Sequence, residues 1–405
     1  SIVLNDLLDN KYYTLVNYWA IHCVDKGLIV EPRLLPKFFD WGVHSRKSSP
    51  ELFVKAIGNR GVWLSGFEEQ WKFVTAVAQQ FDWDTAPIGL RVKHLQDLRT
   101  EAPAEAVEKI KQVWKEENAA NRVELIATLA VGISKADEEF LLTALTDKSQ
   151  KVKEKALELV KLIPDSAIIE SYKACLRASI TITQSKLLGL ISRTTVHVKL
   201  QLSNDGVFKT GIQKLSSTKE IGDDDYVLMQ MIADVPPAFW LQHFQMNIAQ
   251  VVEIFGKDDL KKFQPWFCQA VLKFAAAEWA KPLLDNFSNA PVQLLSLLPA
   301  EERLTYAGKF LAQHTDEVLA ALYTGSLQEW SIGFVKQLLP FLADNPHRYN
   351  KQWFEAYIIY LPAGIDQYLD GITLTDEWKN TYWSGIKDEI RKLLLLKEQI
   401  KKAFI

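Results

Sequence analysis

The apolar positions of this chain recur at helical spacing over most of its length, most regularly between residues 137 and 163. Two apolar stripes lie in this stretch: Phe140, Leu141, Ala144 and Leu145, followed by Val152, Ala156, Leu159, Val160 and Ile163. Steps of three and four residues place each stripe on one face of a helix. Between the stripes, Asp147 or Ser149 can end the first helix and cap the second. Pro164 closes the second helix, so the pattern predicts a helix–turn–helix unit.

The same spacing occurs once before, at an offset of 46 residues that superimposes Leu95 on Leu141 and Ile110 on Ala156. Repeats of about 40 to 47 residues are typical of HEAT and armadillo proteins. The interval leaves room for an extra helix near 121–131, so a three-helix unit and a helix pair are both open. The leucine order, the aspartate before the turn and the later alanine resemble a HEAT or armadillo repeat, with Lys153 where HEAT units often carry arginine.

The helical spacing continues through residues 166–192 and is then interrupted. Residues 196–202 alternate apolar and polar side chains with a period of two, and Asn204-Asp205-Gly206 is a turn signal. We therefore expect a small β-hairpin or a loop excursion near 194–224. From residue 225 onward the spacing is helical again, and the last helix is expected to begin at 375–377, where acidic residues suit the first turn.

These patterns predict an all-α protein with a HEAT/armadillo-like α-solenoid fold, an α–α superhelix. We divide the sequence into four segments: 1–85, an N-terminal helical region; 86–192, HEAT-like repeats; 193–224, the hairpin or loop excursion; and 225–405, a C-terminal helical array that ends in a basic helix. Stacked helix pairs of this kind present a long concave surface, which favours the binding of large partners.

The most distinctive short string is Gly58-Asn59-Arg60-Gly61-Val62-Trp63-Leu64. Two glycines around Arg60 predict a tight non-helical turn that could hold a guanidinium and an indole in fixed positions. The string is not a phosphate loop, because it lacks the lysine ending and no strand precedes it. Two interpretations are open: a helix end with a packed tryptophan and a paired arginine, or a site for a ligand or partner.

Composition narrows the chemistry that the chain can carry. The 405 residues have a formal net charge of −3, so no global basic field attracts nucleic acid. The seven histidines form no metal-binding pair, and the three cysteines lie far apart, which predicts buried free thiols. No nucleophile elbow or dinucleotide fingerprint is present. We expect no cofactor and no metal, and we favour a non-catalytic protein.

No apolar run approaches the length of about 18 residues that would span a membrane, and the N-terminal residues lack the order of a signal peptide. A cytoplasmic location is therefore expected. Residues 387–402 contain six basic and three acidic side chains. Such a helix can bind membranes or nucleic acid, but we interpret it as the polar face of a terminal capping helix.

Several strings along the chain also resemble an uncharacterised bacterial family of helical-repeat proteins. They are Gly58-x-Arg60-Gly61-x-Trp63-Leu64, Leu98-Arg99 followed by Pro103 and Trp114, then Arg122, and LLxALxDKxxxVKxxA. Members are typically encoded beside MoxR-type AAA+ ATPases, von Willebrand A-domain proteins and SWIM zinc-finger proteins. The resemblance implies no known activity, only an ATPase-linked assembly. The candidate binding residues are Asn59, Arg60, Trp63, Arg99 and Arg122.

The leading hypothesis is a scaffold or adaptor that binds protein partners, an AAA+ ATPase or a von Willebrand A-domain protein among them. The main alternative is a HEAT-like nucleic-acid-binding protein or DNA glycosylase-like enzyme, which would use a basic concave face. The central repeat has a local charge excess of only +2, so a nucleic-acid partner is not favoured. A third hypothesis is a small-molecule enzyme with Arg60 and Trp63 in an N-terminal cleft.

Overall fold

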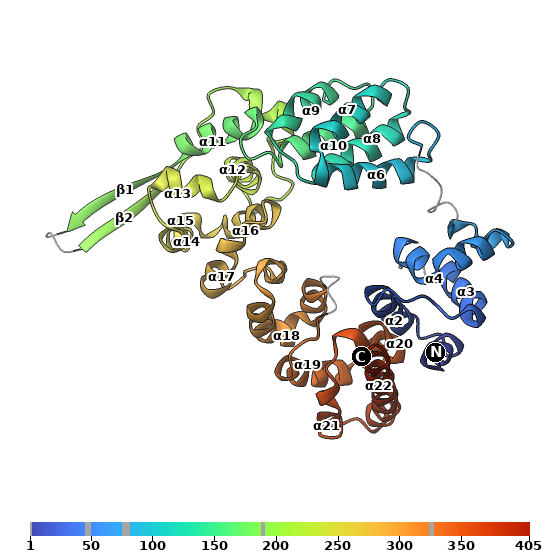
Figure 1. The fold of residues 1–405 in the computed structure, drawn as a ribbon. Coiled ribbons are helices and arrows are strands. Elements are labelled where there is room, and N and C mark those ends of the chain that lie inside the picture. The colour runs from blue at the N-terminus through green and yellow to red at the C-terminus, as the bar shows by residue number, and fades with distance from the viewer. Residues whose placement is uncertain (1, 45–49, 75–81, 188–190, 324–327) are drawn as a thin grey trace. The chain divides into compact units, whose positions relative to one another are not determined.

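A computed structural model describes residues 2–44, 50–74, 82–187, 191–323 and 328–405. The described residues form helices and one two-stranded antiparallel sheet, which confirms the predicted all-α class with a small hairpin (Figure 1). Among the helices in these ranges, none combines the length and the apolar character needed to cross a bilayer. The chain divides into two compact units: unit 1 comprises residues 1–81 and 300–405, and unit 2 comprises residues 82–299.

Unit 2 is a succession of short helices, each packed on helices near it in the sequence. Its elements are α6 (Ile88–Glu101), α7 (Pro103–Val113), α8 (Ala119–Ala127), α9 (Glu138–Ala144), α10 (Gln150–Val160), α11 (Ala167–Ser179), β1 (Ile180–Leu187), β2 (Ile191–Val198), α12 (Asp223–Asp234), α13 (Ala238–Phe244), α14 (Ile248–Phe255), α15 (Asp258–Lys261), α16 (Gln264–Lys273) and α17 (Ala277–Asn286). Short 3-10 turns connect them: η3 (Thr128–Ala130), η4 (Lys135–Asp137), η5 (Asp205–Thr210) and η6 (Val292–Leu297).

The predicted helix–turn–helix unit is confirmed as α9 and α10. Both predicted stripes face the core, and eight of their nine members are buried: Phe140, Leu141, Ala144, Val152, Ala156, Leu159, Val160 and Ile163. Ser149 occupies the N-cap position of α10, and its backbone N–H donates to Asp147 Oδ1 at 2.7 Å. The additional helix expected near 121–131 is α8, which packs on α10.

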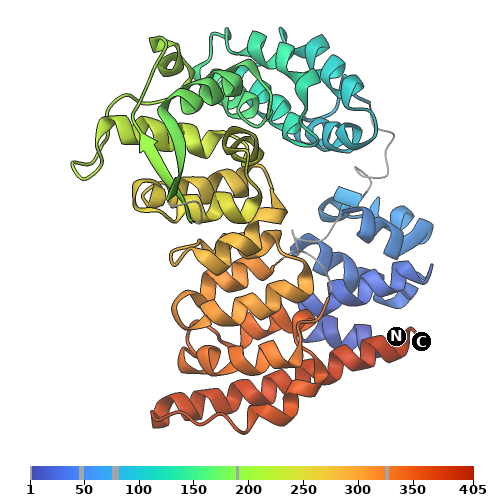
Figure 2. The same ribbon diagram turned by 90° about the vertical axis from the view of Figure 1, so that its left-hand side faces the viewer.

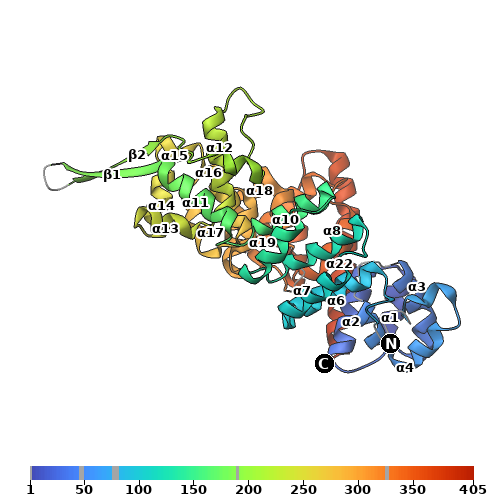
Figure 3. The ribbon, with the colours of Figure 1, turned by 90° about the horizontal axis from the view of Figure 1, so that it is seen from above.

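The β-hairpin lies earlier in the sequence than predicted. It spans residues 180–198 with the register Ile180↔Val198 to Leu187↔Ile191, and it projects from the helices of unit 2 (Figures 1 and 3). The helical spacing predicted through residues 166–192 therefore ends at Ser179, and residues 188–190 lie outside the described ranges. The run ITIT has β-branched residues with a period of two, which favours a strand. Asn204 belongs to no hairpin turn, because its side chain caps η5 instead.

Unit 1 is built from both ends of the chain. Its elements are α1 (Ile2–Asp9), α2 (Tyr13–Asp25), η1 (Pro32–Leu34), α3 (Leu35–His44), α4 (Pro50–Ser65), η2 (Glu69–Trp71), α18 (Ala300–Leu322), α19 (Ile332–Asp344), α20 (Lys351–Tyr357), η7 (Ile358–Tyr360), η8 (Ala363–Ile365), α21 (Asp366–Leu369) and α22 (Glu377–Ala403). The helix α2 packs on α20 and α22, and the two chain ends lie near each other (Figure 2). The Tyr12 hydroxyl donates to Glu389 Oε1 at 2.8 Å, across this junction.

The predicted non-helical geometry is limited to Gly58, whose φ of +59° separates two helical segments at a kink in α4. Residues 59–64 after it are helical, which corrects the longer turn that was predicted. Glycine adopts this left-handed conformation without the penalty that a Cβ imposes. Gly61 has a different role, because a Cβ there would collide with the Ile57 side chain. One glycine therefore kinks the helix, and the other permits close packing.

Candidate functional site

Arg99, one of the predicted binding residues, is buried within unit 2 and has no free donor to offer a ligand. Its guanidinium forms two hydrogen bonds of 2.8 Å to the Asp137 carboxylate. It also donates to the carbonyl oxygens of Val131 at 2.9 Å, Gly132 at 3.0 Å and Pro103 at 3.2 Å. The side chains of Arg99 and Asp137 are 0% and 2% exposed. This arrangement ties α6 to the start of α9, which is a structural task.

Arg122 holds the next pair of elements together. Its guanidinium donates to the Glu117 carbonyl at 2.6 Å and lies 3.1 Å from Asp147, and it sits over the Trp114 ring. Burial alone would raise the pKa of Asp147, but hydrogen bonds from the Ser149 backbone and from Arg122 more than offset burial and lower it. The arginine thus clamps the turn between α9 and α10 onto α8.

The other three predicted residues lie together on one exposed face of α4. Asn59, Arg60 and Trp63 follow the kink at helical spacing, and Phe67 comes one turn later. Trp63 and Phe67 are each 65% exposed, with ring centroids 4.7 Å apart in an edge-to-face arrangement. Of the two interpretations of this string, the one with a packed tryptophan is therefore wrong. Whether this face binds a ligand or partner stays a prediction.

Exposed aromatic side chains are concentrated in unit 1. Among the described residues, all seven that are at least 37% exposed lie there: Tyr13, Trp63, Phe67, Tyr323, Phe341, Trp378 and Tyr382. The large exposed apolar residues of unit 2 are aliphatic: Leu90, Val131, Leu142 and Leu215. One aromatic group of unit 1 is layered, because the His347 ring lies 4.6 Å from that of Trp378, which lies 5.8 Å from that of Tyr382. The two units therefore present different surfaces.

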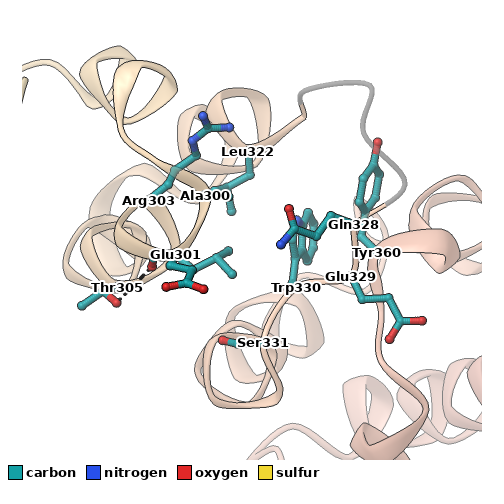
Figure 4. A pocket seen from close by; sticks show the side chains of 11 residues that line it. Ala300, Glu301, Arg303, Thr305, Leu322, Gln328, Glu329, Trp330, Ser331 and Tyr360 are labelled. Atoms are coloured by element: carbon teal, nitrogen blue, oxygen red, sulfur yellow. Dashed lines mark hydrogen bonds between the residues drawn. The ribbon is translucent and has the colours of Figure 1, made fainter. Parts of the chain in front are cut away.

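Unit 1 also contains a pocket of about 330 Å³ between α18, the N-terminus of α19 and the turn η7 (Figure 4). Eleven residues line it: Ala300, Glu301, Arg303, Leu304, Thr305, Leu322, Gln328, Glu329, Trp330, Ser331 and Tyr360. Both ends of α18 reach the pocket because the chain departs from helical geometry at His314. Trp330 stacks on Tyr360 with centroids 5.2 Å apart and planes at 13°. Ser331 caps α19 by accepting from the Phe334 N–H at 3.2 Å.

Ion pairs fix the wall of the pocket to α22. Glu329 lies 2.8 Å from the Lys397 ammonium and 2.7 Å from that of Lys401. Lys397 is 1% exposed and also donates to the carbonyls of Ile358, Ile359 and Leu361 at 3.2, 2.8 and 2.9 Å. Burial lowers the pKa of Lys397, and Glu329 opposes that shift. Since Glu329 and η7 border the pocket, α22 positions its wall.

The basic residues of α22 are largely engaged in such contacts. Arg391 pairs with Asp366 at 2.8 Å and Asp370 at 2.6 Å, and Lys387 pairs with Asp370 at 3.0 Å. The helix therefore does not present an unopposed basic strip, which non-specific binding to phosphates requires. Within the described ranges, no three His, Cys, Asp or Glu side chains are placed to hold a metal ion.

Acid should weaken unit 1 through Glu329. Burial raises the pKa of this carboxyl, but its bonds from Lys397 and Lys401 more than offset burial, and the folded-state pKa lies below the ordinary 4.5. The stabilisation is therefore complete above about pH 4.5 and is lost as the pH falls through the folded-state value. When the pH is lowered from about 6 to about 3, the free energy of unfolding measured in urea should fall less for Glu329→Gln than for the unaltered chain. Equal losses would contradict this role.

The three cysteines, Cys23, Cys175 and Cys268, are buried free thiols, as predicted. Burial raises the pKa of Cys23 to about 11 and that of Cys268 to about 12, and it also raises the pKa of Cys175. Because the thiolate is the nucleophile, we expect no thiol to react with dithiobis-nitrobenzoate in the native chain near pH 8. All three should react in denaturant. Rapid modification of the native chain would contradict this expectation.

The sequence signals for the pocket were weaker than those for α4. Ser331 before the stripe Phe334 and Leu338 is an N-cap signal, but nothing local indicates that Tyr360 stacks on Trp330.

Comparison with curated proteins and with solved structures finds no match. A protein-family model, in contrast, matches residues 2–404, nearly the whole chain. The chain therefore belongs to a family of unknown function, DUF5691, which confirms the predicted membership of an uncharacterised family.

Proposed function

We propose that this protein is a non-catalytic helical-repeat scaffold that binds protein partners mainly through unit 1. The observation that carries the proposal is the gathering of exposed aromatic side chains on that unit. Tyrosine, tryptophan and phenylalanine are enriched at protein interfaces because they bury a large area at a small cost in side-chain entropy. They also supply most interface hot spots, tyrosine and tryptophan above all.

The face of α4 is the best first candidate for an anchor. Trp63 and Phe67 contact each other but leave about two thirds of their surface in solvent. Arg60 lies on the same face, and arginine is the third residue type that recurs in hot spots. An adaptor needs no catalytic group, and Arg99 and Arg122 of unit 2 serve its internal structure instead.

The first partners to test are AAA+ ATPases of the MoxR type and von Willebrand A-domain proteins. The resemblance of the strings around Arg60, Arg99 and Arg122 to proteins encoded beside such genes motivates this choice. A scaffold of stacked helices would suit an ATPase-linked assembly, because it presents separate surfaces to several proteins.

The decisive experiment compares partner recovery by three full-length chains. The unaltered chain, Trp63→Ala/Phe67→Ala, and the control Leu142→Ala/Leu215→Ala are used as bait against purified MoxR-type ATPase and von Willebrand A-domain proteins. The control removes exposed aliphatic side chains from unit 2. We expect stoichiometric recovery by the unaltered chain and by the control, and at least about a tenfold loss with the double aromatic variant.

The outcomes separate the parts of the proposal. Failure of both purified partners, together with no stoichiometric protein from native lysate, would overturn the scaffold function. If both double variants recover the partners equally well, the interface lies elsewhere and the assignment of the α4 face as an anchor is wrong. Circular dichroism should show the same helix content for all three chains, because each substituted side chain is exposed.

A further inference from the structure

The two strands of the hairpin in unit 2 differ in what covers their outer sides. Among the described residues, the sheet consists of β1 and β2, so each strand has one side without a neighbouring strand. On the β2 side, α15 packs against the strand, and the Lys257 ammonium donates to the Thr194 carbonyl at 3.3 Å. On the other side, β1 packs on α11, the helix that leads into it. Figures 1 and 3 show the hairpin extending beyond the helices at its base.

The hydrogen-bond register shows which residues of β1 face its outer edge. In an antiparallel pair, residues that bond to the neighbouring strand alternate with residues whose backbone N–H and C=O point away from it. The Lys199 N–H donates to the Ser179 carbonyl at 2.9 Å, one position before the sheet begins. The even-numbered residues from Ile180 to Lys186 therefore direct their backbone groups outward. The Ile180 carbonyl lies 2.6 Å from His243 Nε2, which agrees with this phase.

Beyond Ile180 the edge of β1 is accessible. Among the described residues, nothing outside the hairpin donates to or accepts from the Ile182 backbone. The side chains of Thr181 and Thr183 on either side of it are exposed, and the strand continues to Leu187. At about 3.3 Å per residue, the open stretch is about 20 Å long, which suits an added strand of about five or six residues. An unpaired edge of this kind is a template for a further strand.

The sequence around the hairpin is strongly basic. Between Glu170 and Glu220 the chain has eight lysines and arginines and one acidic residue, although its formal net charge is −3. The hairpin contributes Lys186 and Arg193 and no acidic side chain. At its base, exposed cationic side chains lie on both sides of Ser179, namely Arg177 and Lys199. The open edge therefore lies in a field of positive sign.

We propose that β1 accepts an acidic, extended segment of a partner protein as a third strand. The outward backbone groups of Ile182, Gln184 and Lys186 would pair with this segment. Strand addition gains affinity from main-chain hydrogen bonds, and charge complementarity selects among the segments that could bind. Because the occupant is a protein segment, the assignment rests on the proposed scaffold function, and it gives unit 2 a binding surface of its own.

Edge and charge together select this occupant. A second copy of the chain would place another basic hairpin against the first, and like charges across a strand pair are destabilising. Nucleic acid would match the positive charge, but its phosphates are acceptors and cannot donate to the outward carbonyl groups of β1. An extended acidic peptide supplies N–H donors, C=O acceptors and negative charge at once.

The test measures the fluorescence anisotropy of labelled peptides mixed with the full chain. The first probe is an acetylated and amidated octapeptide of alternating glutamate and valine, and the second has lysine in place of glutamate. We expect the glutamate peptide to bind saturably and the lysine peptide not to bind. A third probe is the glutamate peptide with N-methyl groups on its two central residues, which blocks strand pairing on both of its edges. It should bind at least about fivefold more weakly, because charge and length are unchanged.

Three variants of the chain test the edge and the charge separately. Gln184→Pro removes an outward N–H and leaves the bonds to β2 in place, since proline is tolerated where the N–H faces solvent. It should weaken binding of the glutamate peptide about fivefold. Lys186→Gln/Arg193→Gln should weaken it about three- to tenfold. The control Lys148→Gln/Lys151→Gln removes two exposed lysines at the start of α10 and should leave the affinity unchanged.

Four results would overturn the proposed strand addition: no binding of the glutamate peptide, equal binding of its N-methylated form, unchanged affinity in Gln184→Pro, or unchanged affinity in Lys186→Gln/Arg193→Gln. A labelled DNA duplex that binds in place of the peptide would assign the hairpin to nucleic acid instead. Dimers that Gln184→Pro abolishes would assign the edge to a second copy.

Failure of the scaffold function gives a different result. Trp63→Ala/Phe67→Ala should bind the glutamate peptide as the unaltered chain does, because these residues belong to unit 1. Capture of a protein partner without peptide binding would remove the assignment of the β1 edge alone. Peptide binding without any captured partner would leave the edge assigned and remove the scaffold.

Discussion

Replacing Asp137 with alanine is expected to lower the free energy of unfolding by about 3 to 5 kcal/mol. The substitution would leave the Arg99 guanidinium buried beside carbonyl oxygens, without the carboxylate that balances its charge. It would also remove the capping box in which Asp137 accepts from the Ser134 N–H at 2.9 Å. Both losses fall on the junction of α6 and α9, so helices of unit 2 should separate. Urea unfolding followed by circular dichroism measures the change.

An exposed ion pair of the same unit provides the control. Lys155 and Glu158 are 2.7 Å apart on α10, with side chains 29% and 60% exposed. Glu158→Ala should cost less than about 1 kcal/mol, because solvent screens such pairs. The double variant Arg99→Met/Asp137→Leu should recover part of the stability that Asp137→Ala loses, since it buries no unpaired charge. A loss in Asp137→Ala no larger than that in Glu158→Ala would contradict the structural role of Arg99.

The contrast between Phe140 and Arg99 indicates what the sequence could predict. Phe140 belongs to a stripe whose period is local, so the face that it buries follows from a few neighbours. Arg99 gains its role from Asp137, 38 residues away, and from the carbonyls of a 3-10 turn. Arg99 was predicted as a binding residue because the string Leu98-Arg99 resembles an uncharacterised family. The residues next to it in the sequence could not distinguish a ligand site from a buried structural ion pair.

The extent of the turn at Gly58 and the position of the hairpin were predicted wrongly for a related reason. The pair Gly58 and Gly61 predicted a turn, yet one glycine serves a kink and the other a close approach to Ile57, which depends on packing. The hairpin was predicted from the alternation at residues 196–202, of which β2 contains only the first three, whereas helical spacing was predicted through residues 166–192. The period changes at Ile180 from 3.6 to 2 without any glycine or proline to announce it.

The pocket was hidden because its parts come from distant segments. Glu301 begins α18, Trp330 precedes α19, and Tyr360 ends η7, so their meeting depends on how the helices of unit 1 pack. The exposure of Trp63 was equally hidden, since a tryptophan in an apolar stretch is usually packed. Trp63 was nevertheless among the predicted binding residues, and its exposure gives that prediction a physical basis.

Replacing Lys397 with methionine is the second change for which we expect a large effect, a loss of about 2 to 4 kcal/mol of unfolding free energy. Methionine keeps the apolar stem in its buried position but removes the ammonium donor. The carbonyls of Ile358, Ile359 and Leu361 would then lose a charged partner at the end of a 3-10 turn. Urea unfolding measures the loss, and hydrogen exchange should locate it in η7 and the adjoining end of α20.

Lys401→Met is the matched control for this position. Lys401 shares Glu329 with Lys397, but it is 34% exposed, and it also pairs with the exposed Glu398 side chain at 2.9 Å. Its loss should cost less than about 1 kcal/mol. If both variants lost equally little unfolding free energy, the pairing with Glu329 would be the main stabilising contribution of Lys397, and its bonds to the carbonyls would add little. A larger effect for Lys397 would show that a buried ammonium capping η7 holds the Tyr360 side of the pocket in place.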